Sequence, residues 1–402
     1  MSSSFSIPSL DDCFFGQDDP TPQKIFSGVA SSSAVGEHAK ALGSHALVVT
    51  DRGVMSAGHP QKIIESLNAA GLQTSLFADS VENPTDSSVC QCAERVASLG
   101  IDLIVGVGGG SSLDTAKGAN FILTNGGSMK DYWGVGKVTN TLLPMIAIPT
   151  TAGTGSECQS YALISEDKTH RKMACGTPSA LPRVTLLDPE LTLSQPFTVS
   201  AATGMDALAH TLESAVCTKR NRFSHRHANK GFSLLIQNLM TIYDEPDNLA
   251  ARESVLLGAA HAGAAIERSM LGAAHALANP LTSRKGVVHG KAVGLTLPVV
   301  LAYNREDPDV AKIYADLARN AGIADVKACD EEATEILLEQ IVHLRTLCKL
   351  PTRLHQVDCQ PEDLTQLSRD AAEQWTGKFN PRSLGETQFY KLYQMIEKFA
   401  GD

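Results

Sequence analysis

The sequence has few cysteines and no long hydrophobic run, and each scarcity argues against a class of protein. Its nine cysteines are dispersed over 402 residues and include no CxxC pair, so neither zinc-finger spacing nor a disulfide-stabilised scaffold is expected. No stretch approaches the roughly 18 uncharged apolar residues that span a bilayer. The N-terminus carries acids where a signal peptide is apolar. We therefore expect a cytoplasmic protein without a membrane partner.

Positive charge is also scarce. Lys and Arg number 34 against 44 Asp and Glu, which gives a net charge of −10. Such a chain lacks the basic footprint of a nucleic-acid-binding protein, and its densest basic cluster, around Lys219, Arg220 and Arg222, has the character of a solvated helix end or loop. With 43% hydrophobic residues, the composition is that of a globular protein. No nucleic-acid partner is expected.

The two halves of the chain differ in hydrophobic periodicity. Short apolar runs alternate with helical patterns in the first half, which predicts βαβ units and a parallel sheet. The strands are expected at 45–50, 72–78, 101–110 and 142–150, with helices at 60–70, 88–99 and 112–123. Beyond the turn-rich segment 189–196, helical patterns dominate, at 199–216, 227–243, 253–269, 309–322 and 331–348. We expect an α/β domain over 1–197 and an all-α domain over 198–402.

A glycine-rich turn follows the strand expected at 101–110. Gly108, Gly109 and Gly110 stand between this strand and the next helix. Glycines there leave backbone N–H groups open at the positive end of a helix, where a phosphate is stabilised. The spacing matches neither the Rossmann fingerprint nor a Walker A loop. A phosphate site and a simple tight turn are therefore both open.

Several polar residues surround this turn. We expect Ser111 or Ser112 to cap the helix, with Asp114 in its first turn. Asp51 follows the strand at 45–50, where a carboxylate favours NAD because it repels a 2′-phosphate; a plain turn residue is the alternative. The segment 149–157, PTTAGTGSE, offers hydroxyls and bare backbone after another strand.

One aspartate and three histidines form a second candidate site. Asp206 and His210 are four residues apart in GMDALAH, a spacing that places both on one face of a helix. His275 and His289 lie in segments of small and apolar residues. A carboxylate with three imidazoles is a donor set for Fe(II) or Zn(II). A single histidine is more often a core or surface residue, so the four gain weight only as a set.

These motifs resemble those of one known family. The order GGGSSLDTAK, PTTAGTGSE, GMDALAH, HALANP and HGKAVGLTLPVV is similar to that of the iron-containing (group III) alcohol dehydrogenases, over about residues 20–395. The resemblance implies the dehydroquinate synthase-like fold. In that fold an α/β dinucleotide-binding domain, here 1–197, precedes an all-α metal-binding domain, here 198–402.

The resemblance also implies an activity and its site residues. It implies a metal-dependent NAD(P) oxidoreductase that acts on a small-molecule alcohol or aldehyde and forms a homodimer or larger homo-oligomer. NAD is expected rather than NADP, with Fe(II) or, alternatively, Zn(II) as the metal. The dinucleotide would be held by Asp51, Gly108, Gly109, Gly110, Ser111, Ser112, Asp114, Thr150, Thr151 and Lys172. The metal, and catalysis through it, would depend on Asp206, His210, His275 and His289.

The sequence departs from the family pattern at two positions. Family members usually have a second histidine where this chain has Asn279, a catalytic candidate that cannot titrate, and an asparagine where it has Val293. Two alternatives follow. One is a lyase or cyclase of the dehydroquinate synthase kind, against which Asp206 argues because that group typically carries glutamate there. The other is a cofactor-binding protein with impaired turnover.

Overall fold

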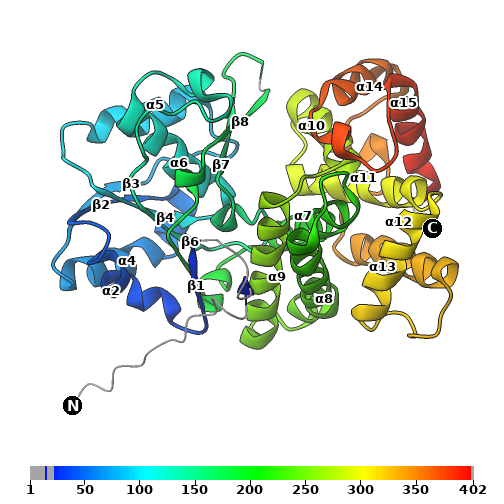
Figure 1. Ribbon diagram of the computed structural model, residues 1–402, viewed down its shortest axis with the longest axis horizontal. Coiled ribbons are helices and arrows are strands. Elements are labelled where there is room, and N and C mark those ends of the chain that lie inside the picture. Colours follow the sequence, from blue (N-terminus) through cyan, green and yellow to red (C-terminus); the bar gives the residue numbers. More distant parts are fainter. Residues whose placement is uncertain (1–13, 16–21, 170, 400–402) are drawn as a thin grey trace. The chain divides into compact units, whose positions relative to one another are not determined.

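The computed structural model describes residues 14–15, 22–169 and 171–399 (Figure 1). The chain forms two compact units, Met1–Gln195 and Pro196–Asp402, whereas the sequence places the seam after residue 197. The strands of the described residues all belong to the first unit, and the second unit is built from helices. The predicted fold class, an α/β domain followed by an all-α domain, is confirmed.

The first unit contains a six-stranded parallel sheet. Its spatial order is β1-β9-β6-β4-β2-β3, and every pairing in it is parallel. The strands are β1 (Lys24–Ser27), β2 (His45–Val49), β3 (Gln73–Phe77), β4 (Leu103–Gly108), β6 (Met145–Pro149) and β9 (Val184–Leu187). Parallel pairing brings the carboxyl ends of neighbouring strands to one edge, where ligands bind in open α/β sheets.

Helices cover both faces of this sheet (Figure 1). One face packs on α2 (Val35–Ala39) and α4 (His59–Ala69), and the other on α5 (Asp86–Val96) and α6 (Gly110–Asn125). Neighbouring residues of β2 enter opposite cores, because side chains alternate along a strand. Burial on both faces explains why these strands are continuous apolar runs in the sequence. The short helix α3 (Arg52–Ser56) follows β2.

A second, three-stranded sheet was not predicted from the sequence. It contains β5 (Gly134–Val135), β8 (Lys172–Gly176) and β7 (Tyr161–Ser165), with β7 and β8 antiparallel. Its residues share a core with α5 and α6, in which Val89, Phe121 and Ile164 are buried. β5 is only two residues long, so hydrophobic periodicity has nothing to detect there.

Nine helices make up the described part of the second unit, together with short 3-10 turns. They are α7 (Phe197–Val216), α8 (Arg222–Asp244), α9 (Leu249–Glu267), α10 (Ala273–Lys285), α11 (His289–Asn304), α12 (Pro308–Asn320), α13 (Asp330–Leu347), α14 (Leu364–Glu373) and α15 (Glu386–Met395). The sequence did not predict α10, α11, α14 and α15. Of these, α10 and α11 contain an internal proline, Pro280 and Pro298, and such prolines argue against a helix in a sequence.

The helices of the second unit are rich in buried alanine and glycine, which allows close packing. A Cβ added at Gly290 of α11 would overlap the carbonyl oxygen of Ala202 on α7. One added at Gly204 of α7 would lie 2.5 Å from Leu239 Cδ2 of α8. The small residues therefore set how closely α11 and α8 approach α7.

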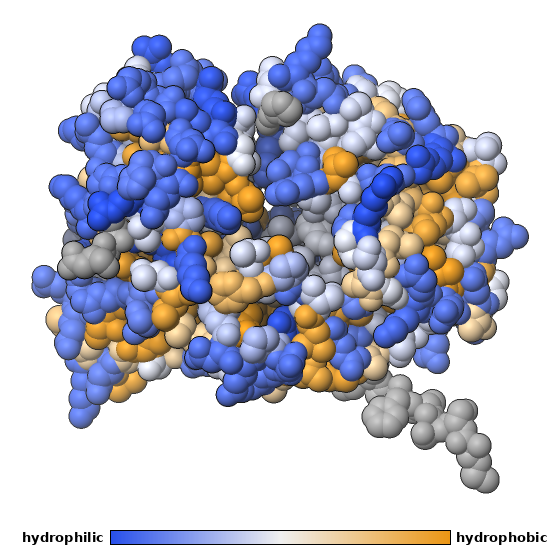
Figure 2. Space-filling view, turned by 180° about the vertical axis from the view of Figure 1, so that it is seen from behind, coloured by the Kyte–Doolittle hydropathy of each residue, from blue (hydrophilic) through white to orange (hydrophobic). Residues whose placement is uncertain are grey.

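None of the described helices is both long and apolar enough to cross a membrane. Figure 2 shows hydrophilic side chains over much of the face in view, with hydrophobic residues among them.

Replacing Gly290 by alanine should destabilise the second unit. The new methyl group would displace α11 from α7, and overpacking of this kind typically costs about 1–3 kcal/mol. Urea titration followed by circular dichroism should show the loss, while Lys291→Ala, at the neighbouring and less buried position, should change stability much less. Equal stability of Gly290→Ala and the wild type would contradict the packing described here.

Candidate functional site

The glycine turn joins β4 to α6. Gly108 ends the strand with φ +149°, and the helix begins at Gly110 with Gly109 as its N-cap. The prediction that Ser111 or Ser112 caps this helix is wrong. A Cβ at Gly110 would lie 2.6 Å from Thr154 Cγ2, and one at Gly109 would lie 3.2 Å from Thr151 Oγ1. The packed loop after β6 therefore requires glycines here, and the N-terminal N–H groups of α6 have no side-chain cap.

Asp51 lies beside this turn. Its Oδ1 accepts a hydrogen bond from Val54 N (3.0 Å), so it is the N-cap of α3, and its Oδ2 accepts one from Ser112 Oγ (2.9 Å). β2 and β4 are neighbours, which brings together two features that are about 60 residues apart in the sequence. The structure thus gives Asp51 a turn role and places it against the candidate phosphate site.

Three further predicted residues lie around the turn. Thr150 is buried and its N–H donates to Gly108 O (3.1 Å), which extends the pairing of β6 with β4. Ser111 Oγ accepts from Asn83 N (3.3 Å). Thr151 lies against Gly109. The loop after β6 and the glycine turn are therefore one packed unit.

Asp114 does not lie where the sequence predicted. It is the fifth residue of α6, so it is outside the first turn, and its buried carboxylate accepts from Ser156 Oγ (2.8 Å). Burial raises the pKa of Asp114, and the nearby charges of Lys117 and Lys172 oppose this. Lys172 begins β8, in register with Ser165. Asp114 thus faces the interior of the unit.

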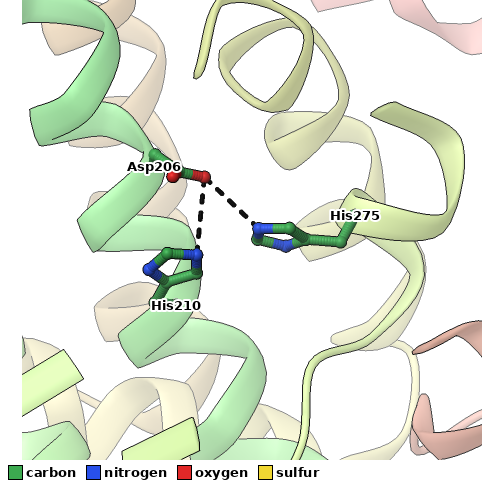
Figure 3. Close-up of side chains that lie close together, drawn as sticks. All are labelled: Asp206, His210 and His275. Atoms are coloured by element: carbon green, nitrogen blue, oxygen red, sulfur yellow. Dashed lines mark ion pairs between the residues drawn. The ribbon is translucent and has the colours of Figure 1, made fainter. Parts of the chain in front are cut away.

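The second predicted set does come together in the structure, on α7, α10 and α11. Asp206 Oδ1 lies 3.3 Å from His275 Nε2 and 3.5 Å from His210 Nε2 (Figure 3). Ligand atoms of these three buried residues all lie within 4.8 Å of one another. His289 Nε2 lies 3.7 Å from the same oxygen, and its side chain is 22% exposed. His289 is therefore the open side of the cluster.

Glu213 is part of this cluster and was missed in the sequence. Its Oε2 accepts from His275 Nδ1 (2.5 Å), and its Oε1 accepts from Ala274 N at the start of α10 (2.6 Å). Glu213 is three residues after His210 on α7, a spacing that continues the shared helix face. Glu213 could have been found in the sequence, because Asp206, His210 and Glu213 are spaced by four and then three residues, which places all three on one face of a helix.

The hydrogen bond that His275 donates to Glu213 determines which nitrogen of His275 can bind a cation. With Nδ1 donating to Glu213, Nε2 of neutral His275 presents a lone pair to Asp206 Oδ1. Neither Nε2 nor Oδ1 has a hydrogen-bond partner among the described residues. Two acceptors that face each other across 3.3 Å need a positive charge between them, either a proton or a metal ion. The nitrogen and oxygen atoms gathered here are suitable ligands for a divalent metal.

The pKa values reflect the same demand for positive charge. Burial opposes ionisation of Asp206, but the imidazoles of His210, His289 and His275 hold its pKa well below the usual range. Burial disfavours the imidazolium of His275, but Glu213 and Asp206 raise its pKa to about 9. Without a metal, a proton therefore compensates the carboxylates.

Asn279 lies one helical turn after His275 on α10. Its Nδ2 donates to Gln374 Oε1 (3.1 Å), and Gln374 Nε2 donates to Asp370 O (3.3 Å). The side chain is half-buried. The structure places Asn279 on the His275 side of α10 and tethers it to the end of α14.

Comparison with known proteins identifies the family. The family model described as "Iron-containing alcohol dehydrogenase" matches residues 22–189, and that of the family's C-terminal region matches residues 200–396. The chain belongs to the iron-containing alcohol dehydrogenase family. It is an oxidoreductase that interconverts an alcohol with an aldehyde or ketone.

Three relatives illustrate the match. The chain is 32% identical to the 1,3-propanediol dehydrogenase of Citrobacter freundii, over 93% of this chain and 97% of that protein. A 1,3-propanediol oxidoreductase structure matches with a TM-score of 0.88 at 31% identity, over 92% and 97% of the two chains. The sulfoacetaldehyde reductase of Bifidobacterium kashiwanohense, solved with NAD⁺, matches with a TM-score of 0.83 at 27% identity, over 94% and 97%.

A buried acid, Glu157, lies in the loop after β6, and its burial predicts that the stability of the protein depends on pH. Glu157 is 2% exposed, its Oε1 has no partner among the described residues, and its backbone carbonyl accepts from Gln23 Nε2 (2.5 Å) and Thr185 Oγ1 (3.1 Å). Burial raises the pKa of Glu157 to about 7, although Lys117 opposes this. The folded protein therefore favours the neutral carboxyl.

Replacing Glu157 by glutamine should remove this pH dependence. A raised pKa contributes stability that is present below the unfolded value of 4.5 and is lost as pH rises through 7. At about 1.4 kcal/mol per pH unit the loss is about 3 kcal/mol. Urea titrations from pH 4 to 8 should show the wild type losing stability relative to Glu157→Gln. Exposed Glu82→Gln serves as the control, and parallel profiles of wild type and Glu157→Gln would contradict the prediction.

Proposed function

We propose that this protein is an NAD-dependent alcohol dehydrogenase or aldehyde reductase whose metal is held by Asp206, His210, His275 and His289. The observation that carries the proposal is the pair of facing acceptors, Asp206 Oδ1 and His275 Nε2, in a buried cluster. The family is named for iron, and one carboxylate with imidazoles suits Fe(II), with Zn(II) as the second choice.

The metal and the nicotinamide supply the reactive chemistry. When bound, a divalent metal supplies a Lewis acid for the oxygen of the alcohol or carbonyl, and the nicotinamide accepts or donates the hydride. The chain supplies their positions. Glu213 orients His275 through Nδ1, and the other three proposed ligands converge on the same buried point. Held in this way, the donors need little reorganisation to bind a metal.

The glycine turn is the proposed site for the dinucleotide. Glycines at the N-terminus of the 16-residue helix α6 leave N–H groups open to a pyrophosphate, and one reported relative was solved with NAD⁺. Gly108, Gly109, Gly110, Ser111 and Ser112 would surround the pyrophosphate. Asp51 would face the ribose, with Thr150, Thr151 and Lys172 toward the nicotinamide. The inward position of Asp114 argues against its direct contact with the cofactor.

Asn279 has a polar role in this proposal and no acid–base role. An amide neither gains nor loses a proton near neutral pH, so the alcohol proton passes by water or ribose hydroxyls. The two alternatives from the sequence, a lyase or cyclase and a cofactor-binding protein without turnover, receive no support from the reported relatives, which are named as oxidoreductases.

The substrate is a small alcohol or aldehyde. Reported relatives are named for a diol and for a sulfonated aldehyde, so substrate choice within the family depends on residues outside the shared motifs. A cytoplasmic location and a homodimer or larger homo-oligomer remain predictions, which fractionation and light scattering would test.

Metal content tests the proposed ligands. Asp206→Ala should lose bound metal and aldehyde-dependent oxidation of NADH, because the central oxygen of the cluster is gone. Glu213→Gln should lower metal affinity by about 10–100-fold, the usual effect of losing a carboxylate behind a metal-binding histidine. Elemental analysis and an NADH-coupled panel of aldehydes and keto acids measure both, with buried His261→Gln as the control. Full metal content and turnover in Asp206→Ala would exclude the assignment.

Cofactor preference tests Asp51. Asp51→Ser keeps an oxygen that can cap α3 but removes the charge, so NADP should gain on NAD by at least about tenfold in kcat/KM. Steady-state kinetics with the two cofactors measures the ratio, and a melting curve checks the cap. An unchanged ratio in a stable variant would show that Asp51 does not face the ribose.

A further inference from the structure

Lys117 is a fully buried lysine in the motif that begins with the glycine turn. It lies on α6 and is 0% exposed. Its Nζ lies within hydrogen-bond distance of four oxygens, which share its three N–H groups: the backbone oxygens of Ser156 (2.6 Å), Gln159 (2.7 Å) and Tyr161 (2.9 Å), and Ser156 Oγ (2.9 Å). One ammonium ion therefore binds the backbone of two residues in the segment between β6 and β7 and of Tyr161, the first residue of β7.

The counter-charge of Lys117 lies on the same helix. Asp114 precedes it by three residues, so both side chains lie on one face of α6. Ser156 Oγ donates to Asp114 Oδ1 (2.8 Å) and accepts from Lys117 Nζ. The hydroxyl bridges the two charges, which compensate each other inside the unit. A buried ion needs such compensation because water is absent.

The segment that Lys117 binds also holds the wall of the glycine turn. Thr154 Oγ1 accepts from Ser156 N (3.3 Å), and Thr154 O accepts from Gln159 Nε2 (2.8 Å). The side chain of Thr154 is the group that a Cβ at Gly110 would overlap. A continuous series of contacts therefore runs from the buried ammonium ion through Ser156 and Gln159 to Thr154 and the N-terminus of α6.

We propose that Lys117, with Asp114 as its counter-ion, is a positioning residue for dinucleotide binding that touches no atom of the dinucleotide. It holds Thr154 against Gly110 and so keeps the N–H groups of the turn in one arrangement. The motif GGGSSLDTAK then contains two sets of residues: the glycines and serines of the turn, and an inward Asp–Lys pair that supports them. This inference rests on the proposed dinucleotide site.

The test compares Lys117→Met, which keeps the length of the side chain without its charge, with the wild type. The dissociation constant for NADH, from fluorescence titration, should rise about tenfold, equivalent to about 1.4 kcal/mol. The KM for NAD should rise in parallel, while kcat at saturating NAD and the metal content stay within about twofold. A merely structural role would lower the melting temperature and leave NADH affinity of the folded protein unchanged. That result would overturn the proposal.

Asn120→Ala is the matched control. Asn120 is buried on the same helix, and its amide exchanges two hydrogen bonds with the backbone of Leu143, away from the loop that Lys117 holds. The variant should lose stability and keep the NADH affinity of the wild type. A loss of affinity equal to that of Lys117→Met would overturn the proposal, because any buried defect in α6 would then have the same effect.

Two milder variants decide the question if Lys117→Met does not fold. Ser156→Ala removes the bridging hydroxyl but keeps all three carbonyl partners, and Asp114→Asn removes the counter-charge but keeps an acceptor. Both should weaken NADH binding about threefold, and wild-type affinity in both would overturn the proposal. If the wild type itself binds no NADH, the proposed dinucleotide site fails. If the wild type binds NADH and Gly110→Val does not, the dinucleotide site at the glycine turn is supported. The NADH affinity of the Lys117 and Ser156 variants then decides whether Lys117 positions the turn.

Discussion

A charged group remains in a protein interior only where other groups compensate it, and each unit of this chain contains such an arrangement. In the first unit the ammonium ion of Lys117 has Asp114 and four oxygen partners, all from the protein. In the second unit Asp206 and Glu213 are buried among imidazoles, and two acceptors still face each other. A buried charge that protein groups balance fully, such as that of Lys117, stabilises the fold. A buried charge that they balance only in part, such as that of Asp206, indicates a site for a ligand.

The helix composition of the second unit follows from this arrangement. Asp206, His275 and His289 come from three helices, and their atoms meet only if the helix axes approach closely. Alanine and glycine permit that approach, as the contact between Gly290 and Ala202 shows. Each of these helices therefore has a face of small residues. The few polar residues on these faces, Asp206, His275 and His289 among them, are the ones whose side chains meet at the site. Low charge and low side-chain volume are properties of the site as much as of the core.

Much of the fold could be predicted because periodicity is a local property. The buried runs that became β2 and β4 have apolar residues on both faces, and the amphipathic pattern at 331–348 became α13. Prediction failed where the local structure depends on contacts with a segment that is distant in the sequence. Gly109, and no serine, caps α6 because Thr151 and Thr154 leave no room for side chains there. Strand β5, with two residues, is too short for a hydrophobic period to show.

The site divides in the same way. The sequence by itself determined the donor types, the shared helix face of Asp206 and His210, the glycines before α6 and the resemblance to one family. Only the tertiary structure decided that Asp206, His210 and His275 meet, that Glu213 orients His275, and that Asp114 and Lys117 face inward. The reason is physical: chemical type and helix phase are encoded within a few residues, whereas the direction in which a side chain finds its partner depends on segments that folding brings together.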